Sequence, residues 1–343
     1  MNLSVHLETW PRLRPLRITG HEWESSEVVV VELSRDDLVG RGEAAGVYYL
    51  DETTASIRAQ IEQFADEICV GIDRLSLLSL LPPGGARNAV DCALWDLETQ
   101  SSRRSIWQLT GVPAKPLETV FTIGIEDTLE AMARQAIAAA AYPLLKIKLD
   151  GVEPLERLRA IRNARPDARI VVDANQAWTL TQLTTIAPAF AALGVQMIEQ
   201  PLPRGADTDL EHYRSPVPLC ADESCLHIGE LGAAARRYQM INIKLDKTGG
   251  LTHALELASA ARTHGLGVMV GCMGGTSLAM APAFVLGCVS DFVDIDAPLS
   301  LKCDRLPALA YQGSTVSVFK PEVWGGAGRQ PENHANQPAS TKK

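Results

Sequence analysis

The sequence lacks the features that carry a chain into or across a membrane. No stretch reaches the roughly 18 uninterrupted apolar residues that suggest a membrane-spanning helix. The N-terminal segment MNLSVHLETWPRLRPLRITG has no basic region followed by an apolar region, as a secretory signal peptide would. We therefore expect a cytoplasmic protein.

Dense runs of lysine and arginine are also absent, and the 32 basic residues are outnumbered by 41 acidic ones. The net charge of −9 argues against nucleic acid as a partner, because phosphate backbones select basic surfaces. The seven cysteines form no CxxC pair of the kind that binds zinc or exchanges disulfides, so we interpret them as reduced, mostly small core residues. A small-molecule ligand is the favoured kind of partner.

What the sequence does contain is a regular repeat. From about residue 143 onward, short β-rich runs alternate with amphipathic helical stretches, which is the pattern of parallel strands connected by helices. Successive predicted strands end 22 to 27 residues apart, near positions 148, 173, 199, 222, 244, 271 and 294. A unit of that size, repeated around a closed sheet, predicts a βα barrel.

The first part of the chain has a different texture, with a strand-like VVVVEL and two predicted helices, ASIRAQIEQFADEI and ARNAVDCALWDLETQ. Small residues at helical spacing in the second helix, such as Ala89 and Ala93, indicate tight packing. We expect an α+β domain over 1–115 and the barrel over 116–320, its last part returning to the first domain. Residues 321–343, rich in Gly, Pro, Asn and Gln, are expected to form a largely disordered tail.

Three carboxylates stand at the ends of three consecutive predicted strands: Asp173 in VVDAN, Glu199 in IEQPL and Asp222 in CADES. The active site of a βα barrel forms at these strand ends, so the three side chains should converge. They would repel one another unless a cation lay among them. Oxygen ligands favour a hard ion, and the sequence therefore predicts a Mg²⁺ site.

Lysines flank this triplet in barrel order. LLKIKLDG places Lys146 and Lys148 on one face of a buried strand, and INIKLDK places Lys244 beyond the carboxylates. Lys148 and Lys244 would approach a metal-bound substrate from opposite walls and exchange a proton on either face of a carbon, as a racemase or epimerase requires. The metal would stabilise the resulting enediolate. Lys146 would tune Lys148, since a second ammonium nearby disfavours protonation.

Each of these motifs alone has a simpler interpretation. A single KxK in a strand is more often a solvated edge, and a lone DAN or DES is usually a turn or helix cap. Five such residues at five strand ends, in order, favour the catalytic interpretation, because five independent structural explanations would otherwise have to hold together.

With these residues the chain resembles the enolase superfamily. The order KxK, DAN, EQP, ADES and a lysine near GG resembles its muconate-lactonizing subgroup and, within it, the dipeptide epimerases, from VVVVEL to about residue 300. The resemblance implies an α/β fold, a (β/α)7β TIM-like barrel with an N-terminal α+β capping domain. It also implies 1,1-proton transfer at the α-carbon of the C-terminal residue of an L,L-dipeptide. Its implied site residues are Asp173, Glu199 and Asp222 for Mg²⁺, with Lys148 and Lys244 as the acid/base pair.

Further residues resemble the family's substrate contacts. Asp294 and Asp296, in DIDAPL, resemble the carboxylates that hold the substrate's N-terminal ammonium, although such a pair can also form a surface turn. The segment GCMGGTSL contributes Cys272, Met273 and Gly274, where small residues would let a peptide backbone approach closely. Thr122 is a candidate contact that serves equally well as a structural residue.

One segment departs from the family. Members that act on L-Ala-D/L-Glu carry an arginine in a first-domain loop that closes over the substrate, whereas here the loop reads ITGHEWESSE. An acidic substrate side chain would meet Glu22 and Glu24, so glutamate is not the expected C-terminal residue. Either these glutamates pair a basic side chain, or Trp23 covers an apolar or small one while the glutamates face water.

Other functions stay open. An N-acylamino acid racemase, o-succinylbenzoate synthase or cycloisomerase of the same superfamily would keep the metal and the lysines but has no need of Asp294 and Asp296. A Schiff-base aldolase also uses a barrel lysine but needs no triple carboxylate, and a non-catalytic binding protein would not need the intact set. A closed homo-oligomer is the expected assembly.

Overall fold

An antiparallel sheet opens the chain in the computed structural model, which describes residues 1–326. Its strands β1 (Asn2–Ile18), β2 (His21–Arg35) and β3 (Leu38–Ala44) lie in the order β1-β2-β3. The VVVV run of β2 is buried on both faces. Val28 and Val30 belong to the large core that includes the barrel, whereas Val29 and Val31 pack with the first-domain helices. Burial on both sides explains why this strand reads as continuously apolar rather than alternating.

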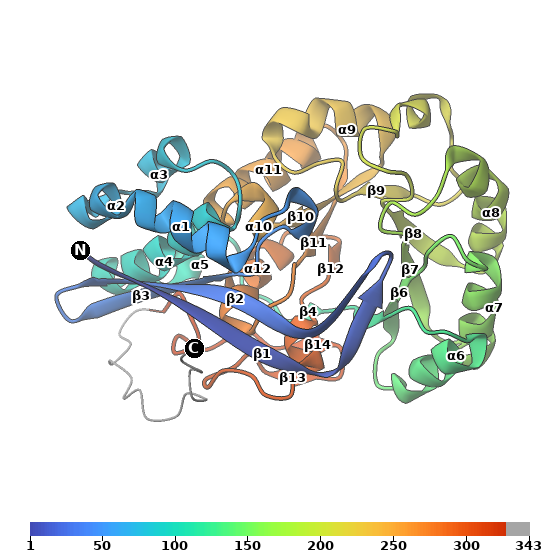
Figure 1. Cartoon of the computed structure of the whole chain (residues 1–343), viewed down its shortest axis with the longest axis horizontal. Helices are drawn as coiled ribbons and strands as arrows, with labels where there is room; N and C mark the ends of the chain where they lie inside the picture. Colours follow the sequence, from blue (N-terminus) through green and yellow to red (C-terminus); the bar gives the residue numbers. More distant parts are fainter. Residues whose placement is uncertain (327–343) are drawn as a thin grey trace.

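Helices cover the other face of this sheet (Figure 1). They are α1 (Thr54–Gln63), α2 (Ala65–Gly71), α3 (Arg74–Leu80), α4 (Gly85–Ser102) and α5 (Ile106–Thr110). Helix α4 packs directly on β3, where a Cβ added to Gly42 would lie 2.0 Å from the carbonyl oxygen of Ala89. A Cβ at Gly40 would lie 2.1 Å from the carbonyl oxygen of Ala93. The tight packing predicted for the small residues of this helix is confirmed.

Eight parallel strands form the second sheet, in chain order from β5 to β12. They are β5 (Phe121–Ile123), β6 (Leu144–Lys148), β7 (Arg169–Asp173), β8 (Val195–Glu199), β9 (Leu219–Ala221), β10 (Met240–Lys244), β11 (Gly267–Gly271) and β12 (Phe292–Val293). The amide of Val120 donates to the carbonyl of Val293 at 2.9 Å and connects the two ends of the sheet. The predicted barrel is confirmed.

The connections between these strands lie outside the sheet (Figure 1). They are α6 (Leu129–Ala138), α7 (Pro154–Ala164), α8 (Leu180–Ala192), η2 (Thr208–His212), η3 (Ile228–Glu230) with α9 (Leu231–Arg237), α10 (Leu245–Thr248) with α11 (Leu251–Thr263), and α12 (Ser277–Gly287). Between β8 and β9 the connection is the short 3-10 helix η2 instead of an α-helix. The order is therefore the (β/α)7β order that the resemblance implied, with this one substitution.

After β12 the chain runs back toward the first domain. It passes through η4 (Ala297–Ser300) and then β13 (Tyr311–Gln312) and β14 (Thr315–Val316). Strand β13 pairs with β14, and β14 pairs with β4 (Leu117–Glu118). Trp324 is fully buried, and its indole donates to the carbonyls of Arg41 at 3.0 Å and Cys92 at 3.2 Å. Residues 321–326 thus differ from the disorder expected there, and the rest of the predicted tail lies outside the described residues.

The segment ITGHEWESSE is the tip of the β1–β2 hairpin rather than an irregular loop. Strand pairing continues to the end, with Leu16 opposite Trp23 and Ile18 opposite His21. The hairpin reaches from the first domain to the barrel (Figure 1). There the hydroxyl of Thr19 donates to the carbonyl of Ala174 at 3.2 Å, just beyond β7.

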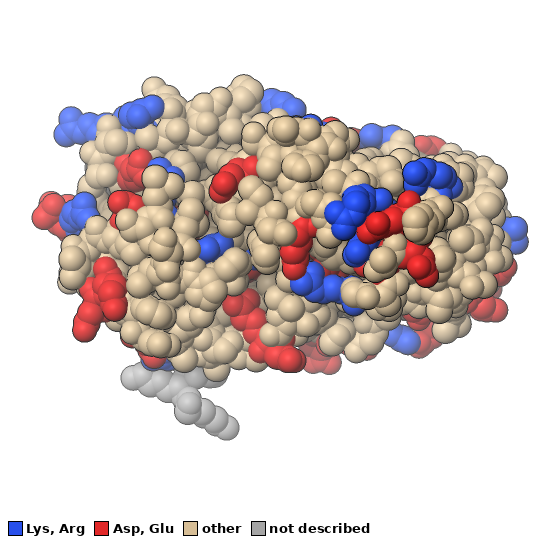
Figure 2. All heavy atoms as spheres, turned by 90° about the horizontal axis from the view of Figure 1, so that it is seen from above, with Lys and Arg blue, Asp and Glu red and all other residues tan. Residues whose placement is uncertain are grey.

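Charged side chains of both signs are intermixed on the face shown in Figure 2. In the described part of the chain, no helix combines the length and apolarity needed to cross a bilayer.

Candidate active site

A cavity of about 510 Å³ lies where the hairpin tip meets the strand ends of the barrel. It gathers residues from both domains that are far apart in the sequence. The predicted lysines and all the predicted substrate contacts line it: Trp23, Glu24, Thr122, Lys146, Lys148, Lys244, Cys272, Met273, Gly274, Asp294 and Asp296. The structure therefore brings together, around one cavity, every lysine and every substrate contact that the sequence analysis selected.

The three predicted metal ligands are fully buried at this end of the barrel. Asp173 ends β7, Glu199 ends β8, and Asp222 directly follows β9. Burial alone would raise the pKa of the Asp173 carboxyl, but the nearby ammonium groups of Lys148 and Lys146 outweigh it and hold that pKa at about 2. The Asp173 carboxyl is therefore ionised and held by cations, whereas burial and the neighbouring Asp173 raise the pKa of Glu199.

The two lysines that were predicted to act on the substrate pair with different carboxylates. Lys148 Nζ lies 2.6 Å from Asp173 Oδ2, and Lys244 Nζ lies 2.7 Å from Asp222 Oδ2. Burial disfavours the charged form of Lys244, but Asp222 and Glu199 more than offset that effect and raise its pKa. Both ammonium groups thus stand between a carboxylate and the cavity.

Lys146 has more partners than the sequence suggested. Its Nζ lies 2.7 Å from Glu199 Oε2, 2.8 Å from Asp294 Oδ2 and 3.1 Å from Asp173 Oδ2. Burial opposes its charge, but these carboxylates raise the pKa of Lys146 well above its usual value. The sequence argument considered only its like charge beside Lys148, and the structure adds three carboxylates that offset this charge.

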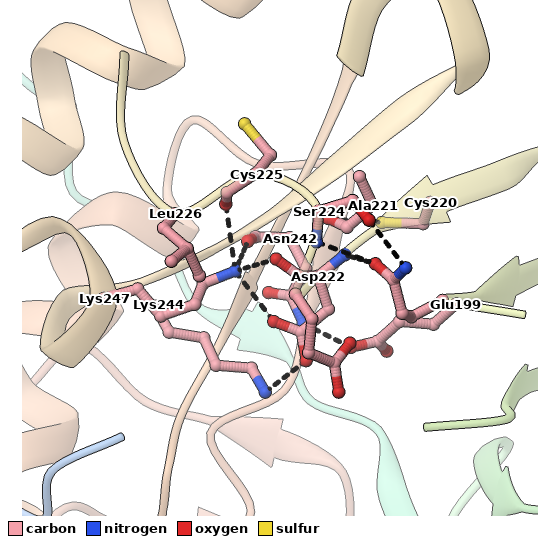
Figure 3. A network of polar contacts seen from close by, with 12 residues as sticks. Glu199, Cys220, Ala221, Asp222, Ser224, Cys225, Leu226, Asn242, Lys244 and Lys247 are labelled. Atoms are coloured by element: carbon pink, nitrogen blue, oxygen red, sulfur yellow. Dashed lines mark hydrogen bonds and ion pairs between the residues drawn. The ribbon is translucent and has the colours of Figure 1, made fainter. Parts of the chain in front are cut away.

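Two residues that the sequence analysis did not select hold the carboxylates in place (Figure 3). Lys247 Nζ donates to Asp222 Oδ1 and to the carbonyl of Asn242, each at 2.7 Å. The side-chain amide of Asn242 donates to Glu199 Oε1 at 2.7 Å. Lys247 could have been selected from the sequence, because it follows Lys244 by three residues. Helix α10 begins directly after Lys244, and one helical turn brings Lys247 back to the same strand end.

The donor set of this cluster suits a hard divalent cation. Oε2 of Glu199 is buried and makes no hydrogen bond of good geometry, although Lys146 Nζ lies 2.7 Å away. Within residues 1–326, no three acidic, histidine or cysteine side chains are already arranged as a metal centre, since lysine ammonium groups lie between the carboxylates. Three buried carboxylate oxygens beside an open cavity are nevertheless the ligands that Mg²⁺ prefers.

Asp294 and Asp296 follow β12 and face the cavity instead of forming a surface turn. Asp294 is buried against Lys146, and Asp296 Oδ2 accepts the backbone amide of Thr122 at 2.6 Å. Enclosure and the neighbouring Asp294 raise the pKa of Asp296 to about 7. Thr122 therefore positions Asp296, and the Asp pair presents negative charge to a ligand.

Aromatic rings cover the cavity from the first domain. The rings of His21 and Trp23 stack with centroids 5.4 Å apart, and the Trp23 ring meets that of Tyr48, in η1 (Tyr48–Leu50), edge-on at 5.1 Å. Glu22 and Glu24 also line the cavity but are exposed. Tyr48 was not selected from the sequence, because its contact depends on how the hairpin folds over it.

The two halves of the chain match two family models. Residues 1–111 match the N-terminal domain of mandelate racemase / muconate lactonizing enzyme, and residues 128–300 match the enolase C-terminal domain-like model. This chain belongs to the enolase superfamily. The resemblance drawn from its motifs is confirmed.

Several superfamily relatives are similar over nearly the whole chain. L-Ala-D/L-Glu epimerase of Escherichia coli strain K12 is 42% identical over 314 residues, 90% of this chain and 97% of that protein. N-acetyl-D-glutamate racemase of a Pseudoalteromonas species is 41% identical over 302 residues, 88% of this chain and 96% of that protein.

Solved structures of superfamily members superpose closely. A protein of Agrobacterium tumefaciens with homology to dipeptide epimerases, solved with sodium and L-Ala-L-Glu, has a TM-score of 0.92 at 41% identity and covers 94% of this chain and 99% of its own. The dipeptide epimerase of Enterococcus faecalis, complexed with Mg and L-Leu-L-Tyr, has a TM-score of 0.86 at 27% identity and covers 93% of this chain and 97% of its own.

Proposed function

We propose that this protein is a Mg²⁺-dependent dipeptide epimerase, an isomerase that moves the α-proton of the C-terminal residue of an L,L-dipeptide. The observation that carries the proposal is the placement of two lysines around one cavity. Lys148 ends β6 and Lys244 ends β10, with the carboxylate-bearing strands β7, β8 and β9 between them. A carbon held between two such groups can lose a proton from one face and regain it on the other.

Asp173, Glu199 and Asp222 would hold the metal. Bound Mg²⁺ supplies positive charge that stabilises the enediolate left after the α-proton is removed. Lys244 stays protonated while Asp222 is its partner, and it loses part of that stabilisation when Asp222 engages a cation. Lys148 Nζ makes the corresponding contact with Asp173 Oδ2, at 2.6 Å. Lys146 and Lys247 keep the carboxylates fixed, since both donate from buried positions.

The remaining cavity residues would bind the peptide. Asp294 and Asp296 take the N-terminal ammonium, with Asp296 oriented by Thr122. The main chain of the peptide would pass Cys272, Met273 and Gly274. Gly274 has a φ of +120°, a backbone conformation that is strained for a residue with a side chain.

Selectivity for the C-terminal side chain would come from the hairpin tip. The aromatic ring of Trp23 favours an apolar or small side chain, and Glu22 and Glu24 favour a basic one. Neither arrangement offers a cation to a C-terminal glutamate, so we expect glutamate to be disfavoured there.

The similarity to N-acetyl-D-glutamate racemase makes an N-acylamino acid racemase the second candidate function. Such a substrate has no ammonium group. Asp294 would keep Lys146 as its counter-charge, but Asp296 would then face a neutral acyl group from an enclosed site, which leaves its charge without a partner. The dipeptide therefore fits the cavity better.

Mixtures of L,L-dipeptides and of N-acetyl-L-amino acids, incubated with the protein and Mg²⁺ in D2O, distinguish the two functions. Mass spectrometry should show a gain of one mass unit, located at the C-terminal residue, in dipeptides. Label only in N-acetylamino acids would establish the second function. Asp294→Asn and Asp296→Asn should strongly reduce labelling of dipeptides, whereas labelling of an N-acyl substrate should change much less.

For the state of the protein in the cell, we propose a closed homo-oligomer in the cytoplasm, following the sequence expectation and the default for enzymes of this kind. Light scattering of the purified protein and fractionation of the source cells test the two parts separately.

A further inference from the structure

Arg12 is a cavity residue that the proposed reaction does not use. It lies in β1, it lines the cavity, and the residue is only 8% exposed. Arg12 was not selected from the sequence, because nothing in PRLRPLR distinguishes it from an ordinary polar strand segment.

The hydrogen-bond partners of the Arg12 guanidinium are neutral. Nη1 donates to Ser300 Oγ at 2.7 Å and Nη2 donates to Ser26 Oγ at 3.1 Å, while Nε is buried without an acceptor. Among residues 1–326, no aspartate or glutamate forms an ion pair with Arg12. Arg305, which also ties β1 to the barrel side, instead contacts the carboxylates of Glu8 and Glu43.

A buried charge that forms no ion pair is costly, even with an acidic group such as Asp296 nearby, and an arginine cannot escape the cost by losing its proton near neutral pH. The planar guanidinium is, however, well suited to bind a carboxylate through two parallel hydrogen bonds. An anion in the cavity would supply both the missing charge and an acceptor. This makes Arg12 a candidate contact for an acidic group of the ligand.

The position of Arg12 indicates which part of the substrate it meets. A Cβ added to Gly274 would lie 3.6 Å from Arg12 Nη2, and Ser300 ends η4, the helix that follows Asp296. Burial lowers the pKa of Arg12, and the nearby Cys272 and Asp296 partly raise it again. Arg12 therefore belongs to the wall that carries the ammonium site, not to the strand ends that carry the metal ligands.

From this placement we infer that Arg12 selects dipeptides whose N-terminal residue is acidic, by pairing with that residue's side-chain carboxylate. The inference rests on the proposed function, which assigns the ammonium to Asp294 and Asp296 and the metal to Asp173, Glu199 and Asp222. In an N-terminal aspartate or glutamate, the ammonium and the carboxylate branch from the same α-carbon. The Asp pair would bind that ammonium, and the adjacent guanidinium of Arg12 would bind that carboxylate.

The test compares two peptides of nearly equal shape, L-Glu-L-Leu and L-Gln-L-Leu, with the wild-type protein and Arg12→Met. The wild type should prefer the glutamyl peptide in kcat/KM by about tenfold or more, the lower end of what a buried charge pair contributes. Arg12→Met should remove that preference through KM, with little change in kcat on the glutaminyl peptide. Arg12→Lys should keep part of it.

Arg305→Met is the matched control, because Arg305 ties the same parts of the chain together but does not line the cavity. It should lower thermal stability and leave the ratio between the two peptides unchanged. If Arg12 only held these parts of the chain together, Arg12→Met would lower kcat on both peptides and keep their ratio. That result would overturn the inference.

The reversed pair, L-Leu-L-Glu and L-Leu-L-Gln, tests the assignment to the N-terminal residue. A preference confined to this pair and lost in Arg12→Met would overturn it, as would equal rates for glutamyl and glutaminyl peptides in the wild type. Thermal shifts of the wild type with each peptide and Mg²⁺ give the same comparison without turnover. A protein that binds glutamyl peptides selectively yet exchanges no α-proton would refute the proposed function and leave the role of Arg12 standing.

Discussion

Lys146 Nζ lies 2.8 Å from Asp294 Oδ2 and joins the buried carboxylate cluster to the Asp pair at the cavity wall. The same ammonium group contacts Asp173 and Glu199. One buried cation therefore balances negative charge contributed by β7, the neighbour of β6, by the next strand β8, and by the segment that follows β12. Its removal would leave several buried carboxylates without a counter-charge.

Lys146→Met should lower the free energy of unfolding by about 3–5 kcal/mol in EDTA, the usual cost of removing one partner of a buried ion pair. Mg²⁺ should restore part of this loss, because a cation at the same carboxylates replaces the missing charge. Urea unfolding with EDTA and with Mg²⁺ measures both effects. Lys302→Met, at an exposed lysine, is the control. Equal stability of Lys146→Met and wild type in EDTA would contradict this role.

Removing the metal should lower the free energy of unfolding, and this effect can be measured separately. At a Mg²⁺ concentration about 100-fold above its Kd, the wild type should gain about 2.7 kcal/mol of stability over the EDTA-treated protein. Asp222→Asn should lose most of that gain, since it removes one of the three carboxylates. Thermal unfolding at constant ionic strength measures the gain. The same increase with NaCl alone would show that ionic strength, and not a metal site, is responsible.

Activity on dipeptides should depend on pH through Asp296. Because its pKa is raised to about 7, this carboxyl is largely neutral at lower pH and cannot pair with an ammonium. Below pH 7, kcat/KM for dipeptides should fall by about tenfold per pH unit. The profile should become flat over this range in Asp296→Asn, on a lower baseline. An unchanged pH profile in the variant would mean that another group titrates.

The raised pKa of Asp296 also makes the stability of the folded protein depend on pH. The unfolded pKa of an aspartate is about 3.9, so the folded protein binds more protons than the unfolded one between that value and 7. The contribution of Asp296 to stability is therefore fully present below pH 4 and is lost as the pH rises through about 7. Unfolding free energies of wild type and Asp296→Asn, compared across this window, should diverge accordingly.

Gly42→Ala should destabilise the first domain without touching the cavity. The added Cβ would lie 2.0 Å from a backbone oxygen of α4, and overpacking of this kind costs about 1–3 kcal/mol or more. Gly232→Ala, in α9 and with no atom within 4 Å of the added Cβ, should be neutral or slightly stabilising. Denaturant midpoints compare the two. A Gly42→Ala protein as stable as wild type would contradict the packing of α4 on β3.

The barrel and its carboxylates could be predicted because both follow from local sequence. Strand ends recur at a near-constant interval, and a residue at the end of a parallel strand has its position fixed by the strand itself. Asp173, Glu199 and Asp222 therefore lie where the pattern placed them. The connection between β8 and β9 did not follow the pattern, because prolines at 201, 203, 216 and 218 interrupt helical hydrogen bonding there.

The remaining parts of the site depend on contacts between distant segments. Arg12 and Tyr48 reach the cavity only because the β1–β2 hairpin docks on the barrel, and no local pattern encodes that docking. The contact of Lys146 with Asp294 joins residues 148 positions apart. Trp324 lies in a Gly-rich segment whose composition suggests disorder, yet one buried indole fixes it to α4 and β3.

The most direct test of two-base catalysis follows α-proton exchange in D2O for the L,L and L,D forms of one accepted dipeptide, with Lys148→Ala and Lys244→Ala. Each variant should lose interconversion of the two forms but still exchange the α-proton of one of them, and the two variants should act on opposite forms. A variant that interconverts both forms at the wild-type rate would contradict the assignment of these lysines to the two faces of the substrate.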